Sequence, residues 1–399
     1  MKKFKSVIAF MFVPLLVLTI PFSLCFKNDL SVDEKRDLAI FPTSFTNNYF
    51  SLFDEWFNDH VPFRNQIISF YNNIDSSIEN AWFNFLLKIS GETSFDYPSS
   101  GSIEDITDPY LDKGQPYYAP RYNGYIIYGR DNWLFYTGDG ALENYKGSDI
   151  LNDFEMNKNM EKFISINDLC VSKEINVSFT VFPNKEQVYA DKMPSIKVIN
   201  RAKKLQRIEH YFKKNSSLNF SYPLDMMIEK RKENDIYLME DTHWNSLGAM
   251  IGYSEILKNL GRSAPIYSYL PIDKQGGDLA SLISSSGSVY TAYEVKYKEN
   301  ITYEVVSDGG RRYIETKSSL NDGSRCVLIG DSYRDAIIPF AAKDYEHLTC
   351  IHYDYMDSEY TSNEISKLKA GDTLIVLSVE RLYPALVKSF DYLSQHLGK

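Results

Sequence analysis

Short apolar segments alternate with amphipathic helices from about residue 150 to the C-terminus, and this alternation constrains the fold more than any other feature. The expected strands are "INVSFTVF", "DIYLME", "RCVLIG", "LTCIHY" and "DTLIVLSVE". Continuous apolar strands separated by helices are typical of a parallel sheet covered on both faces. We therefore predict an α/β fold with a mainly parallel sheet. Helices are expected near 160–173 and 195–213 and after residue 245, with an irregular section over about 261–320.

Polar segments follow the expected strands where each strand ends. They are "PNK" (183–185), "DTHWN" (241–245), "GDSY" (330–333), "DY" (354–355) and "ER" (380–381). Ligands of such sheets bind beyond the carboxyl ends of the strands. We therefore expect the functional site among these segments.

Asp241, His243 and Ser332 have complementary chemistry. A Ser at the start of a helix can be a nucleophile if a base takes its proton, and His243 is a base with an acid two positions before it. In an extended or turn backbone, Asp241 and His243 share one side and can hydrogen-bond. Each motif alone has a simpler explanation, because Ser, Asp and Asn245 are common helix caps. Together they predict a nucleophile, a base and an orienting acid.

A metal-dependent hydrolase is a competing interpretation, because Asp241 and His243 are also possible ligands. No third ligand is apparent, since His347 and His352 lie on or beside another expected strand. We predict that the chain uses no metal and no cofactor.

The three cysteines beyond the N-terminal segment are Cys170, Cys326 and Cys350. Their odd number leaves at least one unpaired, so they indicate no disulfide framework. The chain contains no CxxC motif and no cluster of Cys and His, which argues against a structural zinc site.

The N-terminus predicts a membrane anchor over residues 1–26. Lys2, Lys3 and Lys5 precede an uncharged apolar run from Ser6 to Phe26. Its length is close to the ~20 residues that a helix needs to cross a bilayer. The basic flank should stay in the cytoplasm, which places the rest of the chain outside as a single-pass protein, or as a secreted one if the segment is cleaved.

A net charge of −10 with no basic stripe argues against a nucleic-acid partner.

The rest of the chain divides into three expected parts. Residues 27–92 form a helical approach segment that packs on the catalytic domain, with apolar residues at helical spacing in "FTNNYFSLFDEWF" and in a second helix that begins at Pro62. Residues 93–122 are rich in Pro, Gly and Ser and form a loop or insertion. Residues 123–399 form the catalytic domain, which opens with two short strands in "YNGYIIYGRDNWLFY".

The order of "DTHWN" and "GDSY" resembles that of a known family. It is similar to the alginate O-acetyltransferase group with an SGNH-hydrolase-like domain, and to its Gram-positive relatives, the DHHW proteins. Further similar stretches are "FNDHVPFRNQ" (57–66), "GRDNWLFY" (129–136), "FPNKEQVYADKMP" (182–194) and "ERLY" (380–383). The resemblance spans about residue 30 to the C-terminus and implies an SGNH-hydrolase-like three-layer sandwich with a permuted motif order. Thr242 departs from the DHHW form, and the carbohydrate-binding modules of the family are not evident.

The resemblance also implies a function. It implies a membrane-tethered or exported enzyme that moves acetyl groups onto hydroxyls of a cell-surface or exported polysaccharide, with Asp241, His243 and Ser332 at the catalytic positions. A separate membrane-bound O-acyltransferase would supply the acetyl groups. Position alone adds Asn184, Arg334 and Arg381 as candidate oxyanion or substrate donors. The same three catalytic residues would also serve a glycan acetyl esterase, and a non-catalytic glycan-binding or assembly subunit is a third possibility.

Overall fold

The computed structural model describes residues 118–200 and 202–398, and before them only 30–31, 36–37, 40, 41, 43, 52, 53 and 56. The chain divides into two compact units, residues 1–89 with 121–125, and residues 90–120 with 126–399. Described residues of the first unit form the antiparallel pair β1 (Leu30–Ser31) and β2 (Arg36–Asp37) and the short strand β3 (Tyr122–Asn123). The expected anchor and the expected helix at Pro62 lie outside the described residues. No helix within the described residues has the length and apolarity needed to span a membrane.

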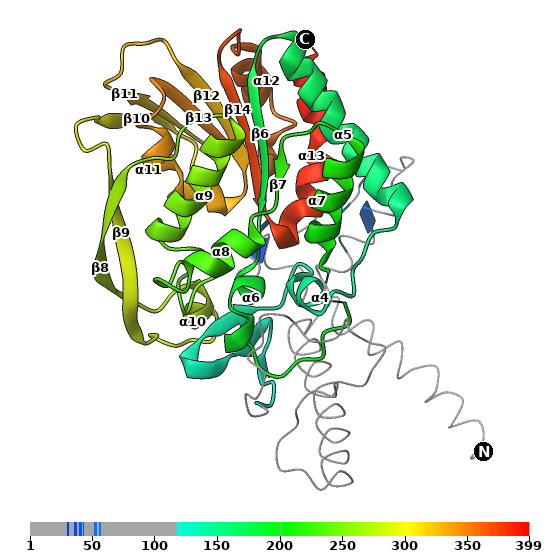
Figure 1. The fold of residues 1–399 in the computed structure, drawn as a ribbon, viewed down its shortest axis with the longest axis vertical. Helices are drawn as coiled ribbons and strands as arrows, with labels where there is room; N and C mark the ends of the chain where they lie inside the picture. The colour runs from blue at the N-terminus through cyan, green and yellow to red at the C-terminus, as the bar shows by residue number, and fades with distance from the viewer. Residues whose placement is uncertain are drawn as a thin grey trace, which may run out of the picture. The chain divides into compact units, whose positions relative to one another are not determined.

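A seven-stranded sheet forms the centre of the second unit (Figure 1). Its strands, in order across the sheet, are β10 (Tyr303–Asp308), β11 (Tyr313–Ser318), β13 (His347–His352), β12 (Arg325–Gly330), β14 (Thr373–Val379), β6 (Asn176–Phe182) and β7 (Phe220–Ser221). Four of the six pairings are parallel, from β13 to β7, and the β10–β11 hairpin is antiparallel. The α/β prediction is confirmed, and the sheet is mixed rather than parallel throughout.

Burial explains why the central strands read as continuous apolar runs. β14 is buried along its whole length, and β12 is buried from Cys326 to Gly330. Both faces of these strands meet helices, so neither face can be polar. The thiols of Cys170, Cys326 and Cys350 are buried and free, as expected for a chain without a disulfide framework.

Helices cover both faces of the sheet (Figure 1). One layer holds α5 (Asp153–Ser172), α7 (Lys204–Asn215), α12 (Glu359–Ser366) and α13 (Tyr383–Leu397); the other holds α8 (Leu224–Lys230), α9 (Ser246–Asn259) and α11 (Ile338–Ala341). β6 contacts α5 on one side and α9 on the other. A capping box explains the start of α5 ahead of the expected position. The Asn152 side chain accepts the backbone N–H of Glu155, and the Glu155 carboxylate accepts the N–H of Asn152.

The expected strand at "DIYLME" is wrong. Apart from a single bridge between Tyr237 and Trp244, this segment forms no strand. The segment folds back on residues 243–245, because the Leu238 N–H donates to the His243 carbonyl and the Asn245 N–H donates to the Ile236 carbonyl. The place beside β6 is taken by β7, a two-residue strand that lies in "LNFSYP".

The section expected to be irregular contains several elements. A long two-stranded ribbon consists of β8 (Tyr267–Gln275) and β9 (Val289–Tyr297), with the short helix α10 (Asp278–Leu282) between them, and β10 and β11 follow. Residues of β8 are mostly exposed, so its pattern lacks the apolar run that marks a buried strand. The hairpin expected near residue 130 is present, as β4 (Ile126–Tyr128) and β5 (Leu134–Tyr136) pair around a 3-10 turn, η1 (Arg130–Asn132).

Candidate active site

The carboxyl ends of the parallel strands meet at one edge of the sheet. Gly330 at the end of β12 is paired with His352 at the end of β13, and Val379 at the end of β14 is paired with Phe182 at the end of β6. Short helical turns begin at this edge. They are η3 (Ser332–Ala336), η4 (Tyr353–Tyr355), η5 (Glu380–Leu382) and α6 (Lys185–Val188).

Asp331 frees the hydroxyl of Ser332 from capping. Its Oδ1 accepts the N–H of Tyr333, 2.8 Å away, which caps η3. Its Oδ2 accepts the N–H of Val379 at 2.7 Å, so the same side chain joins the ends of β12 and β14. The helix that follows Ser332 begins as a 3-10 turn rather than as an α-helix. The turn is fixed, and the Ser332 hydroxyl is available for another partner.

Asn245 caps α9 in a similar way, as its Oδ1 accepts the N–H of Gly248 at 3.0 Å. The cap therefore does not involve His243 or Asp241. The Tyr333 hydroxyl donates to the carbonyl of Thr242 at 2.9 Å, which ties the turn carrying His243 to the turn carrying Ser332.

His243 lies between Ser332 and Asp241. Its Nε2 is 2.7 Å from Ser332 Oγ, and its Nδ1 is 2.8 Å from Asp241 Oδ1. A carboxylate can only accept, so Nδ1 carries a proton, and in the neutral ring Nε2 is then the acceptor of the Ser332 hydroxyl. Asp241 Oδ1 also accepts the backbone N–H of His243 at 3.0 Å, which fixes the carboxylate to the ring. The structure thus brings together the three residues that the sequence singled out.

Hydrogen bonding sets the pKa values of this pair. Burial is the largest single influence on the pKa of Asp241 and would raise it, but the hydrogen bond and charge of His243 and the backbone N–H of Asp278 together hold that pKa below its ordinary value. Burial would also lower the pKa of His243, but the hydrogen bonds to Asp241 and to Asp278 raise it above its ordinary value. The surroundings therefore favour an imidazolium next to a carboxylate.

Lys185 anchors the turn that carries Asp241. Its side chain is buried, and its ammonium donates to the carbonyls of Leu238 and Met239, both at 3.2 Å, and of Asp241 at 2.6 Å. Burial lowers the pKa of Lys185 to about 8, although the nearby carboxylates oppose that shift. This segment forms no strand ladder, so the Lys185 ammonium binds carbonyls that a neighbouring strand would otherwise bind.

Asp278, at the start of α10, is a neighbour of His243 that the sequence analysis missed. Its Oδ2 lies 3.5 Å from His243 Nδ1. Asp241, His243 and Asp278 each present one atom within 4.8 Å of one another, as three metal ligands would. Both ring nitrogens already have partners, however, since Nδ1 donates to Asp241 and Nε2 faces Ser332. The arrangement favours proton transfer over metal binding.

Asn184 is fully buried and links other elements. Its Nδ2 donates to Asn144 Oδ1 at 3.2 Å, and its Oδ1 accepts the N–H of Arg381 at 3.2 Å. Both ends of the side-chain amide are thus engaged with the protein. This structural use argues against Asn184 as a donor to substrate.

The two candidate arginines differ in their surroundings. Arg334 is buried, donates from Nη2 to the Arg311 carbonyl and from Nε to Asp335, and has no partner at Nη1 among the residues that the structure describes. The Arg381 guanidinium lies over the rings of Tyr136 and Tyr333, 5.6 and 6.0 Å from their centroids, and within the described part of the chain its buried Nε has no hydrogen-bond partner. Because Tyr333 adjoins Ser332, Arg381 is the better placed of the two to meet a substrate.

The remaining histidines near the sheet are separate from this cluster. His352 is buried at the end of β13, where its Nδ1 accepts the N–H of Asp354. Burial, followed by the charges of Arg334 and Arg311, lowers the pKa of His352 to about 2. His347 lies at the other end of the strand, beside Glu346.

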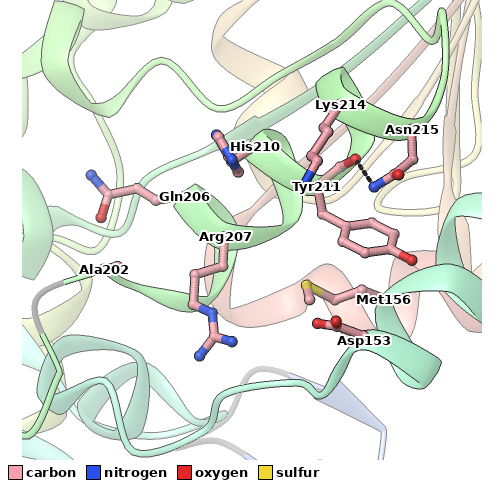
Figure 2. A pocket seen from close by; sticks show the side chains of 9 residues that line it. All are labelled: Asp153, Met156, Ala202, Gln206, Arg207, His210, Tyr211, Lys214 and Asn215. Carbon is pink, nitrogen blue, oxygen red and sulfur yellow. Dashed lines mark hydrogen bonds between the residues drawn. The ribbon is translucent and has the colours of Figure 1, made fainter.

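A pocket of about 790 Å³ lies elsewhere, between α5 and α7 (Figure 2). Its lining is mostly contributed by α7, with Arg207, His210 and Lys214, and by Asp153 and Met156 of α5. None of its lining residues belongs to the Ser332 cluster. The pocket carries no arrangement of nucleophile and base.

A hydroxyl, an imidazole and a carboxylate in this order, with the hydroxyl at the end of β12, have the arrangement that serine hydrolases and acyltransferases use. The chain belongs to a particular family of that class. Residues 126–343, more than half of the chain, match the family described as SGNH hydrolase-like domain, acetyltransferase AlgX. The resemblance drawn from "DTHWN" and "GDSY" is thereby confirmed at the level of the family.

Several solved structures are similar to this chain. PatB1 of Bacillus cereus is 17% identical, with 62% of this chain and 94% of that chain covered and a TM-score of 0.45. For a DHHW family protein from Eubacterium siraeum the identity is 14%, the coverage 68% and 94%, and the TM-score 0.42. The O-acetyltransferase domain of Pseudomonas putida AlgJ is 14% identical, with 67% of this chain and 98% of that chain covered and a TM-score of 0.39. No curated protein matches the chain.

Proposed function

We propose that this protein is an O-acetyltransferase that acts on polysaccharide hydroxyls through an acetyl-serine intermediate. The observation that carries the proposal is the position of His243, whose two ring nitrogens contact Ser332 and Asp241 at 2.7 and 2.8 Å. Membership of the AlgX acetyltransferase family favours transfer over hydrolysis as the reaction.

In the first half-reaction, Ser332 Oγ attacks the carbonyl of a donor acetyl ester and its proton passes to His243 Nε2. The donor C–O bond breaks, and the imidazolium returns the proton to the departing alcohol. In the second half-reaction, a sugar hydroxyl attacks the acetyl-serine and gives its proton to Nε2, which returns it to Ser332. Asp241 fixes the Nδ1–H tautomer and stabilises the imidazolium in both steps. Arg381, whose guanidinium lies over the ring of Tyr333 beside Ser332, is our candidate for stabilising the developing oxyanion.

The proposal also covers the membrane topology of the chain and the source of its acetyl groups. We propose that residues 1–26 anchor the chain in the cell membrane, with the SGNH-like domain outside and preceded by a helical approach segment. A membrane-bound O-acyltransferase supplies the acetyl groups there, because acetyl-CoA is cytoplasmic. The basic residues before the apolar run support this topology.

Substitution of the nucleophile and base tests the mechanism. The soluble part of the chain and its variants Ser332→Ala, His243→Ala and the double variant would be assayed for acetyl groups moved from a model ester to a glycan. Each single change should abolish most transfer, and the double change should cost little more, because residues that act as a unit are not additive. Asp241→Ala should lower the rate of acetyl transfer less than His243→Ala does. A well-folded Ser332→Ala protein with near-normal transfer would refute the mechanism, and release of free acetate without glycan acetylation would make the protein an esterase.

A further inference from the structure

Thr242 and Asp278 form a polar pair beside His243 that the proposed proton transfers do not use. The Thr242 N–H donates to Asp278 Oδ1 at 2.8 Å, and the Thr242 hydroxyl donates to Asp278 Oδ2 at 2.6 Å. In return, the Asp278 N–H donates to Asp241 Oδ2 at 2.9 Å. These bonds join the turn of Asp241 to the start of α10 in a closed ring.

Gly277 makes this close approach possible. A Cβ at that position would lie 2.3 Å from the Glu240 carbonyl oxygen and 2.7 Å from Asp241 Cβ. Beyond it, the N–H of Leu279 donates to the same Glu240 carbonyl at 3.1 Å. The two backbones are therefore in contact, which sets the position of the Asp278 carboxylate relative to His243.

Two carboxylates consequently share one imidazole edge. Asp241 Oδ1 and Asp278 Oδ2 lie 2.8 and 3.5 Å from His243 Nδ1, and the Thr242 hydroxyl lies 3.2 Å from it. The Asp278 side chain is only 7% exposed, so solvent screens its charge weakly. An imidazolium gains from both charges, whereas a neutral ring gains little.

Other charged and titratable groups also face this site. They are Lys185 from α6, Tyr290 from β9, Asp331 at the end of β12, Tyr333 from η3 and Arg381 from η5. Among the described residues, Asp241 and Asp278 are the carboxylates within 4 Å of a His243 ring nitrogen. The position of Asp278 is therefore distinct from that of the more distant charges.

We propose that Asp278 is a positioning residue that, held by Thr242, fixes Asp241 and stabilises the protonated form of His243 while Ser332 is acylated and deacylated. This inference rests on the proposed function. It also gives Thr242, which departs from the DHHW form, a role in this chain. The hydroxyl, together with the Thr242 N–H, holds the second carboxylate beside the ring.

The test is the pH dependence of kcat/KM for a small acetyl ester. Asp278→Asn keeps an acceptor for the Thr242 N–H but removes the charge, so His243 should remain unprotonated to lower pH. The fall of kcat/KM on the acid side of the pH profile (the acid limb) should therefore move by about one pH unit to lower pH. Glu240→Gln is the matched control, because Glu240 contacts the same loop through the Ser288 N–H without touching the ring. Its acid limb should coincide with that of the unchanged protein.

Thr242→Val and Thr242→Ser provide a second measurement. Loss of the hydroxyl should lower kcat several-fold with little change in KM, and Ser should restore kcat. An unchanged acid limb in folded Asp278→Asn would overturn the inference; if that variant does not fold, an unchanged kcat in Thr242→Val would do so. Ser332→Ala, run in parallel, separates the two proposals. Its inactivity leaves the proposed function intact whatever the Asp278 result, whereas its full activity would refute both.

Discussion

At the scale of single residues, neighbouring side chains divide capping and chemistry between them. Asp331 satisfies the start of η3, which leaves Ser332 free to contact His243. Asn245 satisfies the start of α9, which leaves His243 and Asp241 free to contact each other. A polar residue at a helix start can thus be a cap or a reactive group, and here adjacent residues take the two roles.

Both ring nitrogens of His243 are engaged by protein groups, and this predicts that catalysis is independent of metal. Protein treated with EDTA should keep its full rate on a small acetyl ester, because Ser332 and His243 provide the nucleophile and the base. The measurement is the hydrolysis rate before and after chelation, with a known zinc enzyme as the control. Loss of activity that added zinc restores would instead make Asp241, His243 and Asp278 metal ligands.

The sequence could indicate Asp241, His243 and Ser332 because their residue types complement one another and each follows an expected strand. It could not indicate Asp278, because that residue comes from a section without apolar periodicity. Asn184 illustrates the limit of position alone. It lies at the correct edge of the sheet, but its amide is used by Asn144 and Arg381. Position at a strand end does not reveal which way a side chain is bonded.

At the scale of elements, the segment before His243 is held mainly by a side chain, with one backbone bond from the Leu134 N–H of β5 to the Met239 carbonyl at 3.1 Å. The Lys185 ammonium takes the carbonyls of Leu238, Met239 and Asp241. Burying a charged ammonium group costs free energy unless hydrogen-bond acceptors such as these carbonyl oxygens surround it. The α6 turn therefore serves to place the acid of the site.

This arrangement predicts a selective effect of Lys185→Met. The substitution keeps the bulk of the side chain but removes three hydrogen bonds, so the turn should lose its fixed position. We expect kcat for a small ester to fall by about 10- to 100-fold, since small misplacements of reacting groups have effects of that size. Lys230→Met, on the exposed surface of α8, is the matched control and should leave kcat unchanged. Normal kcat in a folded Lys185→Met protein would contradict the anchoring role.

The same segment explains why its strand prediction was wrong. "DIYLME" has the continuous apolar composition of a buried strand, and Ile236 and Tyr237 are in fact buried. The composition of a segment indicates whether it is buried, whereas strand pairing depends on which other backbone segment lies beside it. Here β7 occupies the position next to β6, and "DIYLME" pairs with its own continuation.

At the scale of the whole molecule, the α/β class could be predicted because β6, β12, β13 and β14 are buried on both faces and leave continuous apolar runs. The antiparallel edge was missed, since β10 is largely exposed and carries no such run. The order of strands was also beyond the sequence, because neighbours in the sheet are distant in the chain.

The proposed membrane topology is also tested on the whole molecule. In wall-less cells that express the full chain with a C-terminal tag, added protease should digest the tag, because the basic residues before the apolar run hold the N-terminus inside. A cytoplasmic protein in the same cells should remain intact, which controls for lysis. A tag that is protected until the cells are broken would place the domain in the cytoplasm.

β14 comes last among the strands, yet it lies between β12 and β6 and supplies the Val379 N–H that Asp331 requires. A growing chain therefore contains Asp241, His243 and Ser332 before it contains the strand that holds them at one edge. Assembly of the site must wait for the final part of synthesis.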